Sequence, residues 1–211
     1  MSRRTQELID TRRNEIIGAC ERLYAIKGFK EITMADIAKE TTFTRTSIYN
    51  YFQTKEEIFL ALLQREYDSW ADSIYSVVKE NDSMSDEDIA GFLAHSLEER
   101  EQMLRILSMN HYDMEAGSRK ENLTDFKRSY GRTIHSVESL LMKFRKDMSD
   151  GDIQSFVYSF FPFLYGICPY TAVTPKQDEA MKEADIGFVH HTVYELSYGI
   201  ILGLLTSKNK R

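Results

Sequence analysis

Helix-start signals recur along this 211-residue chain and constrain its fold more than any other feature. In each signal a Ser or Thr is followed three residues later by an acidic residue or Gln, the spacing of a capping box. The chain holds only 3 Pro and 10 Gly, so few residues interrupt the segments between these signals. We therefore predict an all-α fold. The signals are Thr33 with Asp36, Thr54 with Glu57, Ser85 with Asp88, and Thr174 with Gln177.

Apolar residues at helical spacing predict where the helices lie. Ile9, Ile16, Cys20 and Leu23 share one face of the first helix, and Lys27 followed by Gly28 is typical of a helix end. Ranges that read as helix are separated by short polar turns, with a break expected within residues 111–120. The predicted helices cover residues 5–27, 33–41, 45–51, 55–79, 85–109, 121–146, 152–172 (with Pro162 inside) and 174–207.

Charge is spread unevenly along the chain. Residues 1–55 hold ten Lys and Arg against seven Asp and Glu, a net charge of +3, whereas the remainder carries −9. This asymmetry favours contact between the N-terminal segment and an anion, although scatter would also produce it. The overall charge of −6 does not exclude DNA binding, because phosphates meet a local patch and not the net charge.

The first three predicted helices match a helix-turn-helix. Five apolar residues hold the two short helices against the first: Ile37, Ala38, Phe43, Ile48 and Phe52. The third helix then presents polar side chains on its outer face, and such a helix is thin enough to enter the major groove of DNA. N–H groups at the starts of the second and third helices can point at phosphates.

The run ITMADIAKETTFTRTSIYNYFQTKEEIFLALL, residues 32–63, resembles the signature of the TetR family of bacterial transcriptional regulators. The matching positions are Thr33, Asp36-Ile37-Ala38, Tyr49 to Phe52, and Thr54-Lys55-Glu56. Two positions depart from the family pattern, because Thr42 and Thr46 stand where Gly is usual. A residue other than Gly at position 42 is expected to need an altered backbone in the turn.

The resemblance implies a dimeric repressor that binds a palindromic operator in double-stranded DNA and is released by a small apolar or aromatic effector. It implies a helix-turn-helix DNA-binding domain at residues 1–54 and a larger helical ligand-binding and dimerisation domain at 55–211. Arg45 is suited to a guanine and Asn50 to an adenine. The DNA-binding positions carried over from the family are Thr33, Thr44, Arg45, Thr46, Ser47, Tyr49, Asn50, Tyr51 and Lys55.

The last two predicted helices indicate a homodimer. They are apolar on nearly all sides, and a chain of this size has little room to bury them alone. Two half-sites of an operator one helical turn of DNA apart also require two helix-turn-helix domains, which we call heads. The predicted interface residues are Phe156, Phe161, Phe163, Val193, Leu196, Ile200 and Leu204. The predicted ligand-binding residues, chosen as apolar groups with a few hydroxyls, are Trp70, Phe92, Met103, Tyr112, Phe126, Tyr130 and Phe160.

Other classes of protein and site receive less support from the residues. An enzyme or carrier built on a helical bundle stays possible, as does a regulator controlled by a protein partner, but no catalytic motif is present. The five His fit no closed metal site, so neither a metal nor a cofactor is expected. Cys20 and Cys168 make no disulfide framework, and no signal peptide or membrane span is apparent, so we expect a cytoplasmic protein.

Overall fold

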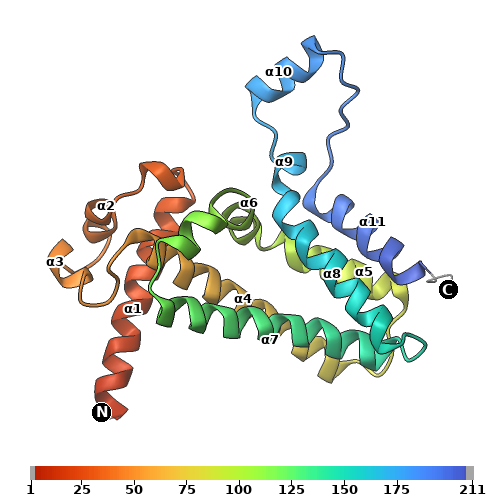
Figure 1. Cartoon of the computed structure of the whole chain (residues 1–211), viewed down its shortest axis with the longest axis horizontal. Coiled ribbons are helices and arrows are strands. Elements are labelled where there is room, and N and C mark those ends of the chain that lie inside the picture. The colour runs from red at the N-terminus through yellow and green to blue at the C-terminus, as the bar shows by residue number, and fades with distance from the viewer. Residues whose placement is uncertain (1–2, 208–211) are drawn as a thin grey trace. The chain divides into compact units, whose positions relative to one another are not determined.

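The structure is a computed structural model that describes residues 3–207, which form helices and no strand (Figure 1). The predicted all-α class is therefore confirmed. The ends of the two predicted domains, residues 1–2 and 208–211, lie outside the described residues. The elements are α1 (Arg3–Tyr24), the 3-10 turn η1 (Phe29–Glu31), α2 (Met34–Lys39), α3 (Arg45–Ile48), α4 (Lys55–Glu80), α5 (Asp86–Glu98), α6 (Glu101–Ala116), α7 (Lys120–Phe144), α8 (Asp150–Gly166), α9 (Cys168–Thr171), α10 (Pro175–Glu183) and α11 (Val193–Thr206).

The chain forms two compact units. The first comprises residues 1–68 and 110–131, and the second comprises residues 69–109 and 132–211. Helices α4, α6 and α7 each contribute residues to both units. None of the helices within residues 3–207 combines the length and the apolar composition of a membrane-spanning helix.

Most of the predicted helix starts are real caps. Thr33, Ser85 and Thr174 each accept a hydrogen bond from the backbone N–H three residues on, and the side chain at that position bonds back to the cap. Two further capping boxes, Ser149 with Asp152 and Thr192 with Glu195, were not predicted from the sequence. Each box satisfies N–H groups that a helix start leaves unpaired.

The predicted helix over residues 174–207 was wrong, because the chain leaves the helix at residue 184. Asp185 adopts φ 52°, and the N–H groups of Asp185 and Ile186 donate to the carbonyls of Lys182 (3.2 Å) and Met181 (2.9 Å). This is the hydrogen-bond pattern of a Schellman motif, which closes a helix with a left-handed residue. The chain stays non-helical until Thr192 caps α11.

Two other predicted helices are also divided. The range 85–109 breaks after Glu98, where Arg100 donates from Nη1 to the carbonyl of Ser96 (2.7 Å) and closes the end of α5. The range 152–172 breaks at Ile167, and Pro169, which lacks an N–H donor, lies in the first turn of α9. The break expected within residues 111–120 falls at its end, since α6 continues to Ala116.

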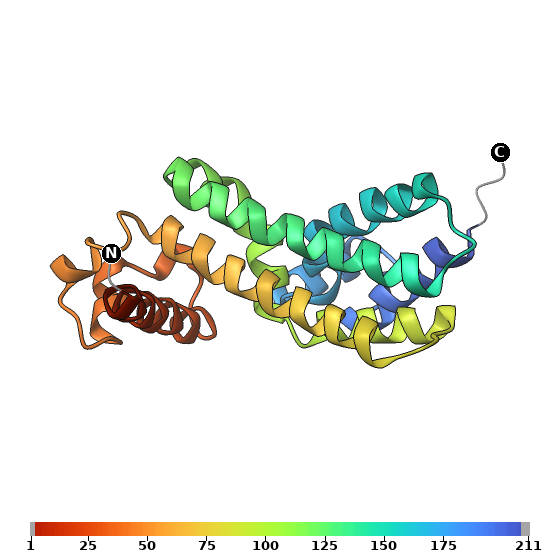
Figure 2. The same cartoon turned by 90° about the horizontal axis from the view of Figure 1, so that it is seen from below.

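The first unit packs α1, α2 and α3 around a common apolar centre. Ile16, Cys20, Ile37, Ile48 and Phe52 are all fully buried there. The first half of α4 runs beside the first half of α7 (Figures 1 and 2), and the Ser129 hydroxyl donates to Asp68 (2.9 Å). Burial of Ile37 and Ile48 in the apolar centre supports the short helices α2 and α3, whose own length does not stabilise them.

A buried carboxylate joins the start of α4 to the turn between α6 and α7 within the first unit. Glu57 is 1% exposed, and its carboxylate accepts from Arg119 Nε (2.6 Å), Arg119 Nη2 (2.9 Å) and the backbone N–H groups of Gln53 (2.8 Å) and Arg119 (3.1 Å). Burial alone would raise the pKa of Glu57, but the guanidinium and the N–H donors outweigh it, so the pKa is lowered.

The same turn fits closely against α4. Thr54 donates from its hydroxyl to the carbonyl of Gly117 (3.0 Å), and a Cβ at position 117 would lie 2.8 Å from Cγ of Glu56. Gly117 is therefore required by a close approach and not by its backbone angles, because its φ is not positive. Thr54 caps α4 by accepting from the Glu57 N–H (3.2 Å), while the Glu57 carboxylate turns to Gln53 and Arg119.

The second unit is centred on Trp70. Its indole N–H donates to the Ser96 hydroxyl (2.8 Å), and its ring lies 6.2 Å from the ring centroids of Phe160 and Phe161. Arg145, which follows α7, donates to Asp86 (2.7 Å) and to the carbonyl of Leu205 (2.9 Å), so it joins the ends of α5 and α11. Cys20 and Cys168 are buried in separate units, and neither forms a disulfide.

Replacing Glu57 by Gln should lower the free energy of unfolding by about 2–4 kcal/mol, because the Arg119 guanidinium then loses a buried counter-charge. Urea denaturation followed by circular dichroism measures the change. The control is Asp125→Asn, which breaks an exposed ion pair with Arg128 and should cost less than about 1 kcal/mol. Equal losses in both variants would show that the Glu57 carboxylate has no special role.

Candidate nucleic-acid interface

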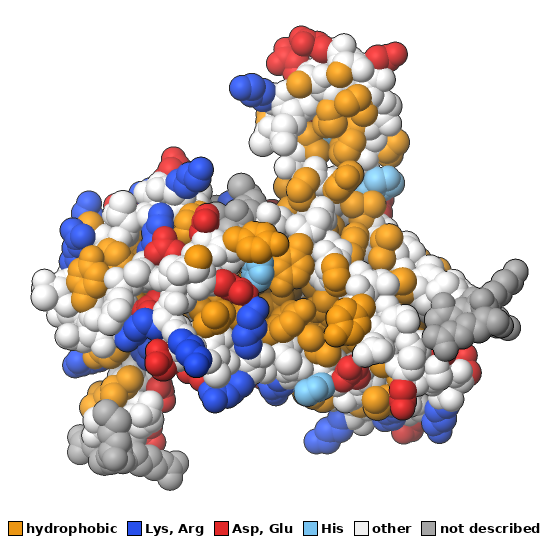
Figure 3. All heavy atoms as spheres, in the orientation of Figure 1, with side chains coloured by type: hydrophobic (Ala, Val, Ile, Leu, Met, Phe, Trp, Pro, Cys, Tyr) orange, Lys and Arg blue, Asp and Glu red, His pale blue; other side chains and the backbone are white. Residues whose placement is uncertain are grey.

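Helices α2 and α3 and the turn between them form a small unit whose inner side is apolar and whose outer side is polar. Ile37 and Ile48 are fully buried, and Phe52 closes the unit from the start of the next turn. Thr46, Tyr49 and Asn50 are exposed on the other side. Figure 3 shows Lys and Arg side chains over this part of the molecule. The arrangement presents hydrogen-bonding groups and positive charge outward from a rigid base.

Two of the predicted DNA-binding residues, Thr33 and Thr44, are helix caps. Thr33 accepts from the Asp36 N–H (3.2 Å) and donates to the Asp36 carboxylate (2.6 Å). Thr44 accepts from the Ser47 N–H (3.2 Å), and its hydroxyl lies 2.9 Å from the Ser47 hydroxyl. These bonds lower the pKa of Asp36 and keep the first turn of each helix in place. Uncapped N–H groups of these turns remain the donors best placed for an anion.

The base-reading candidates lie on α3 and just after it. Arg45 donates from Nη2 to the Tyr49 hydroxyl (3.2 Å), with its guanidinium 5.8 Å from the centre of the Tyr49 ring. Thr46 and Asn50 are exposed, whereas Ser47 is half-buried. The helix ends at Ile48, so Tyr49, Asn50 and Tyr51 belong to the following turn and not to the predicted helix 45–51.

Tyr51 and Lys55 are half-buried and already have protein partners. The Tyr51 hydroxyl accepts from Arg12 Nη1 (3.2 Å). The Lys55 ammonium donates to the carbonyls of Phe29 (2.8 Å) and Ile32 (3.1 Å) and lies 4.3 Å from the centre of the Phe29 ring. Their predicted contacts with DNA stay predictions, and in this structure Lys55 holds η1 against the start of α4.

Arg12 lies beside Tyr51 but was not among the predicted DNA-binding residues. Arg12 is exposed on α1, reaches the Tyr51 hydroxyl and lies 5.7 Å from the centre of the Phe43 ring. Its position beside Tyr51 adds a cation to the same polar surface. Its helical spacing gave no signal, because Arg12 follows Ile9 by three residues and precedes Ile16 by four, which places it at the edge of the apolar face of α1.

The turn accommodates Thr42 without a left-handed backbone. Among the described residues other than Gly, only Asp185 has a positive φ, so the expected distortion at Thr42 is absent. Instead the Thr42 N–H and hydroxyl both donate to Oε1 of Glu15 (2.7 and 2.8 Å). These two bonds lower the pKa of Glu15. Thr42, which stands where Gly is usual, thus bonds the turn to α1 through its hydroxyl and its N–H.

The predicted ligand-binding residues are distributed over both units. In the first unit the Tyr67 ring lies 5.9 Å from the Phe126 ring in a tilted arrangement and 5.5 Å from the Tyr130 ring in an edge-to-face one, and Tyr112 is 86% exposed. The others belong to the second unit: Trp70, Met103 and Phe160, which are fully buried, and Phe92, which is half-buried. Tyr112 has too little contact with its own chain to line an enclosed site.

The predicted interface residues differ in how much surface they expose. Phe156 and Phe161 are each 2% exposed, so their side chains are buried within their own chain and have no surface to offer a partner. Ile200 is 43% exposed. The half-buried members are Phe163, Val193, Leu196 and Leu204.

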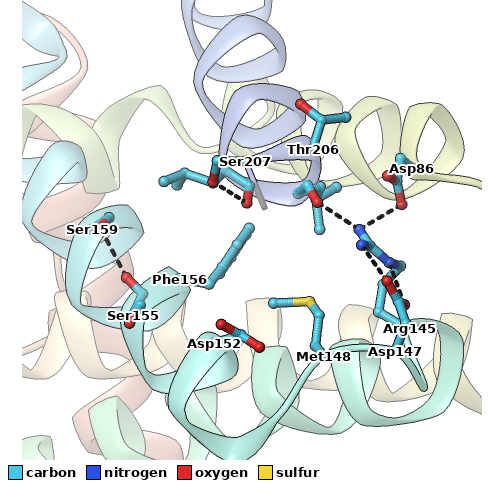
Figure 4. Close-up of a pocket in the computed structure, with 12 residues that line it drawn as sticks. Asp86, Arg145, Asp147, Met148, Asp152, Ser155, Phe156, Ser159, Thr206 and Ser207 are labelled. Carbon is cyan, nitrogen blue, oxygen red and sulfur yellow. Dashed lines mark hydrogen bonds and ion pairs between the residues drawn. The ribbon is translucent and has the colours of Figure 1, made fainter. Parts of the chain in front are cut away.

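A polar pocket of about 720 Å³ lies in the second unit between α8, the end of α11 and the turn before α8 (Figure 4). Its charged groups are paired: Arg145 bonds Asp86 and Asp147, and Asp152 bonds Ser149. It shares Phe156 and Leu204 with the predicted interface and no residue with the predicted ligand site. In the described part of the chain, no three His, Cys, Asp or Glu gather to hold a metal ion.

The variant Thr42→Val tests the tie between the turn and α1. Valine keeps the branched shape and the backbone N–H but removes the hydroxyl donor. The pKa of Glu15 should therefore rise toward its ordinary value without reaching it, whereas the pKa of Asp36 should not move. A carboxyl-detected NMR titration of the wild-type protein and of Thr42→Val measures the two pKa values. An unchanged pKa of Glu15 would contradict the assigned bond.

Comparisons with known proteins agree with this geometry. The model of "Bacterial regulatory proteins, tetR family" matches residues 16–62, and that of "Tetracyclin repressor-like, C-terminal domain" matches residues 64–205. The regulator TtgR of Pseudomonas putida is 43% identical over 63 residues, which are 30% of each chain. The regulator YfiR of Bacillus subtilis is 36% identical over 64 residues, so the matches span about a third of these relatives' length.

Solved structures share the fold over nearly the whole chain. A regulator from Mesorhizobium loti aligns with a TM-score of 0.61 and 18% identity, covering 97% of this chain and 98% of that one. FadR of Bacillus subtilis, solved with stearoyl-CoA, aligns with a TM-score of 0.57 and 14% identity over 92% of this chain and 98% of its own. Because the two family models together cover the helix-turn-helix and most of the remaining chain, this protein belongs to the TetR family of bacterial transcriptional regulators.

Proposed function

We propose that this regulator is a dimeric repressor that binds a palindromic operator and is released by a small apolar or aromatic effector. The observation that carries the proposal is the outer surface of α3 and of the turn after it, where Arg45, Thr46 and Asn50 are exposed above a fully buried Ile48. Base edges in a major groove are read by side chains of these types on a rigid support. The proposal assigns the chain no catalytic activity.

The proposal divides the chain into a DNA-binding domain at residues 1–54 and a ligand-binding and dimerisation domain at 55–211. Support for a division near this point comes from the matches of the two family models, which change over between residues 62 and 64. Since the proposed target is bacterial operator DNA, we place the protein in the cytoplasm.

Affinity in this proposal comes mainly from phosphates. Helix starts at Thr33 and Thr44, together with Arg12 and Lys55, supply donors and positive charge around the reading face. Specificity comes from Arg45 and Asn50, which are long enough and exposed enough to bond two base atoms each. Two heads related by a two-fold axis then read two half-sites.

Control by an effector is a shift between two states of the dimer. Helix α4 continues without a break from residues of the first unit into residues of the second. An effector that binds one orientation of α4 better than another changes the spacing of the two heads, and DNA favours the other orientation. Only the difference in affinity between the states can produce the effect.

The effector in this proposal is a small apolar or aromatic compound. Trp70, Met103 and Phe160, which lie in the second unit, are buried apolar groups that a change in packing there would expose to an apolar ligand. FadR was solved with stearoyl-CoA and another relative of the fold, RolR, with resorcinol. These two compounds are therefore reasonable first probes of an apolar and of an aromatic effector.

The variant Arg45→Ala should weaken binding to the operator by about 5- to 150-fold, which corresponds to about 1–3 kcal/mol for a lost base contact. Fluorescence anisotropy with the DNA upstream of its own gene, beside a scrambled duplex, measures both affinity and preference. Lys79→Ala is the matched control, since it removes one exposed positive charge from the far end of α4. Full sequence preference in Arg45→Ala would remove Arg45 from the reading face.

Effector coupling has its own test. Resorcinol and stearoyl-CoA are first screened for binding by thermal shift, and any binder is then added to the protein–operator complex. We expect a binder to weaken operator affinity at least about fivefold, the lower end of typical allosteric coupling. A compound that binds saturably and leaves operator affinity unchanged would contradict the coupling.

A further inference from the structure

The segment between α9 and α11 lacks a core. We call residues 169–192 the arm; it comprises the end of α9, helix α10 and the loop that leads to α11. None of its residues is buried, and α10 contributes no side chain to any apolar cluster. Figure 1 shows α10 standing away from α8 and α11, which belong to the same unit.

The arm nevertheless carries large apolar side chains. Tyr170 is 60% exposed, Ile186 55% and Val189 64%, and Phe188 is half-buried. Orange side chains are visible along the arm in Figure 3. A water-exposed loop does not need residues of this size, because each leaves apolar surface in contact with solvent.

The ends of α10 are set by local sequence, although its length is not enough to stabilise it. Thr174 and Gln177 form a complete capping box, Pro175 starts the helix, and Asp185 closes it in a Schellman motif. A helix of nine residues is marginal in water even with good caps, and most helix stability in proteins comes from packing. The arm therefore contains a helix with well-defined ends that buries no residue against the rest of its own chain.

We propose that the arm packs on a second copy of this chain, so that the two protomers of the dimer exchange arms. This rests on the proposed homodimer. The arm lies directly between α8 and α11, whose outer faces expose Tyr158 (74%) and Ile200 (43%). In Figure 3 apolar side chains continue from the arm onto the body of the molecule beside it. A two-fold axis makes every contact of one arm occur twice.

The charge of the arm argues against DNA as its occupant. Residues 173–192 contain Lys176 and Lys182 against four acidic residues, a net charge of −2 with the His neutral. Lys182 is also paired with Asp178 (2.7 Å). Phosphates would be repelled by this composition, whereas the apolar groups of a second copy would complement Ile186 and Val189.

The first test locates the arm by photo-crosslinking. A benzophenone maleimide is attached to Glu179→Cys, which is exposed on α10, since Cys20 and Cys168 are buried. Equal amounts of ¹⁴N- and ¹⁵N-labelled full-length chains are mixed, irradiated and analysed by mass spectrometry. We expect covalent dimers with mixed-isotope cross-linked peptides. The control is Lys30→Cys, an exposed site in the first unit, which should give none.

The second test measures the contribution of the apolar groups. Ile186→Asp combined with Val189→Asp should raise the dimer dissociation constant at least about tenfold in sedimentation equilibrium, because buried anchors dominate interface energies. Ile26→Asp is the matched control, as Ile26 is 79% exposed and lies outside the arm. It should leave the constant unchanged.

The outcomes separate this proposal from the one it rests on. Arm exchange would be overturned if the protein is a stable dimer whose arm cross-links only within its own chain. It would also be overturned if the double substitution leaves the dissociation constant of the dimer unchanged. Neither result would contradict the homodimer. A monomer at all concentrations would overturn both.

Discussion

The buried carboxylate of Glu57 is the interaction on which the first unit depends. It carries a full charge at 1% exposure, and such a charge persists in a protein only with near-complete hydrogen bonding. Arg119 and two backbone N–H groups supply that bonding and bring the turn after α6 onto the first residues of α4. Gly117 permits the approach, because a Cβ there would collide with Glu56. The helix-turn-helix therefore rests on a specific polar contact as well as on its apolar centre.

The candidate reading face is built by capping at its edges and by burial beneath it. Thr33 and Thr44 use their hydroxyls to fix the helix starts, which leaves the outward residues of α3 to define what the surface can bond. Thr42 shows how a departure from the family pattern is absorbed. Its hydroxyl and N–H share one oxygen of Glu15, so the turn gains an anchor on α1 in place of the freedom of Gly.

The second unit combines a packed interior with the arm, which has no buried residue. Trp70, Ser96 and the phenylalanines of α8 form a closed centre, and Arg145 joins the ends of α5 and α11. The arm leaves this body without burying a residue of its own. Exposed apolar side chains such as those of the arm are stabilised when a second protein surface covers them. The shape of the single chain is in this way linked to its proposed assembly.

Local signals in the sequence determined the helical class, most helix starts and the helix-turn-helix, because capping boxes and apolar periodicity act within a few residues. They also indicated the polar surface of α3 and of the turn after it, because burial of Ile48 and Phe52 leaves Arg45, Thr46 and Asn50 outward. The division of 174–207 into α10 and α11 was missed, although Asp185 and the Thr192–Glu195 box were present, because apolar spacing continued across the gap. Only the tertiary structure decided the pairing of Glu57 with Arg119, the bonds of Lys55 to Phe29 and Ile32, and the burial of Phe156 and Phe161. The physical reason is distance along the chain: these contacts join residues far apart in sequence, and no local pattern records which of several helices will lie opposite a given side chain.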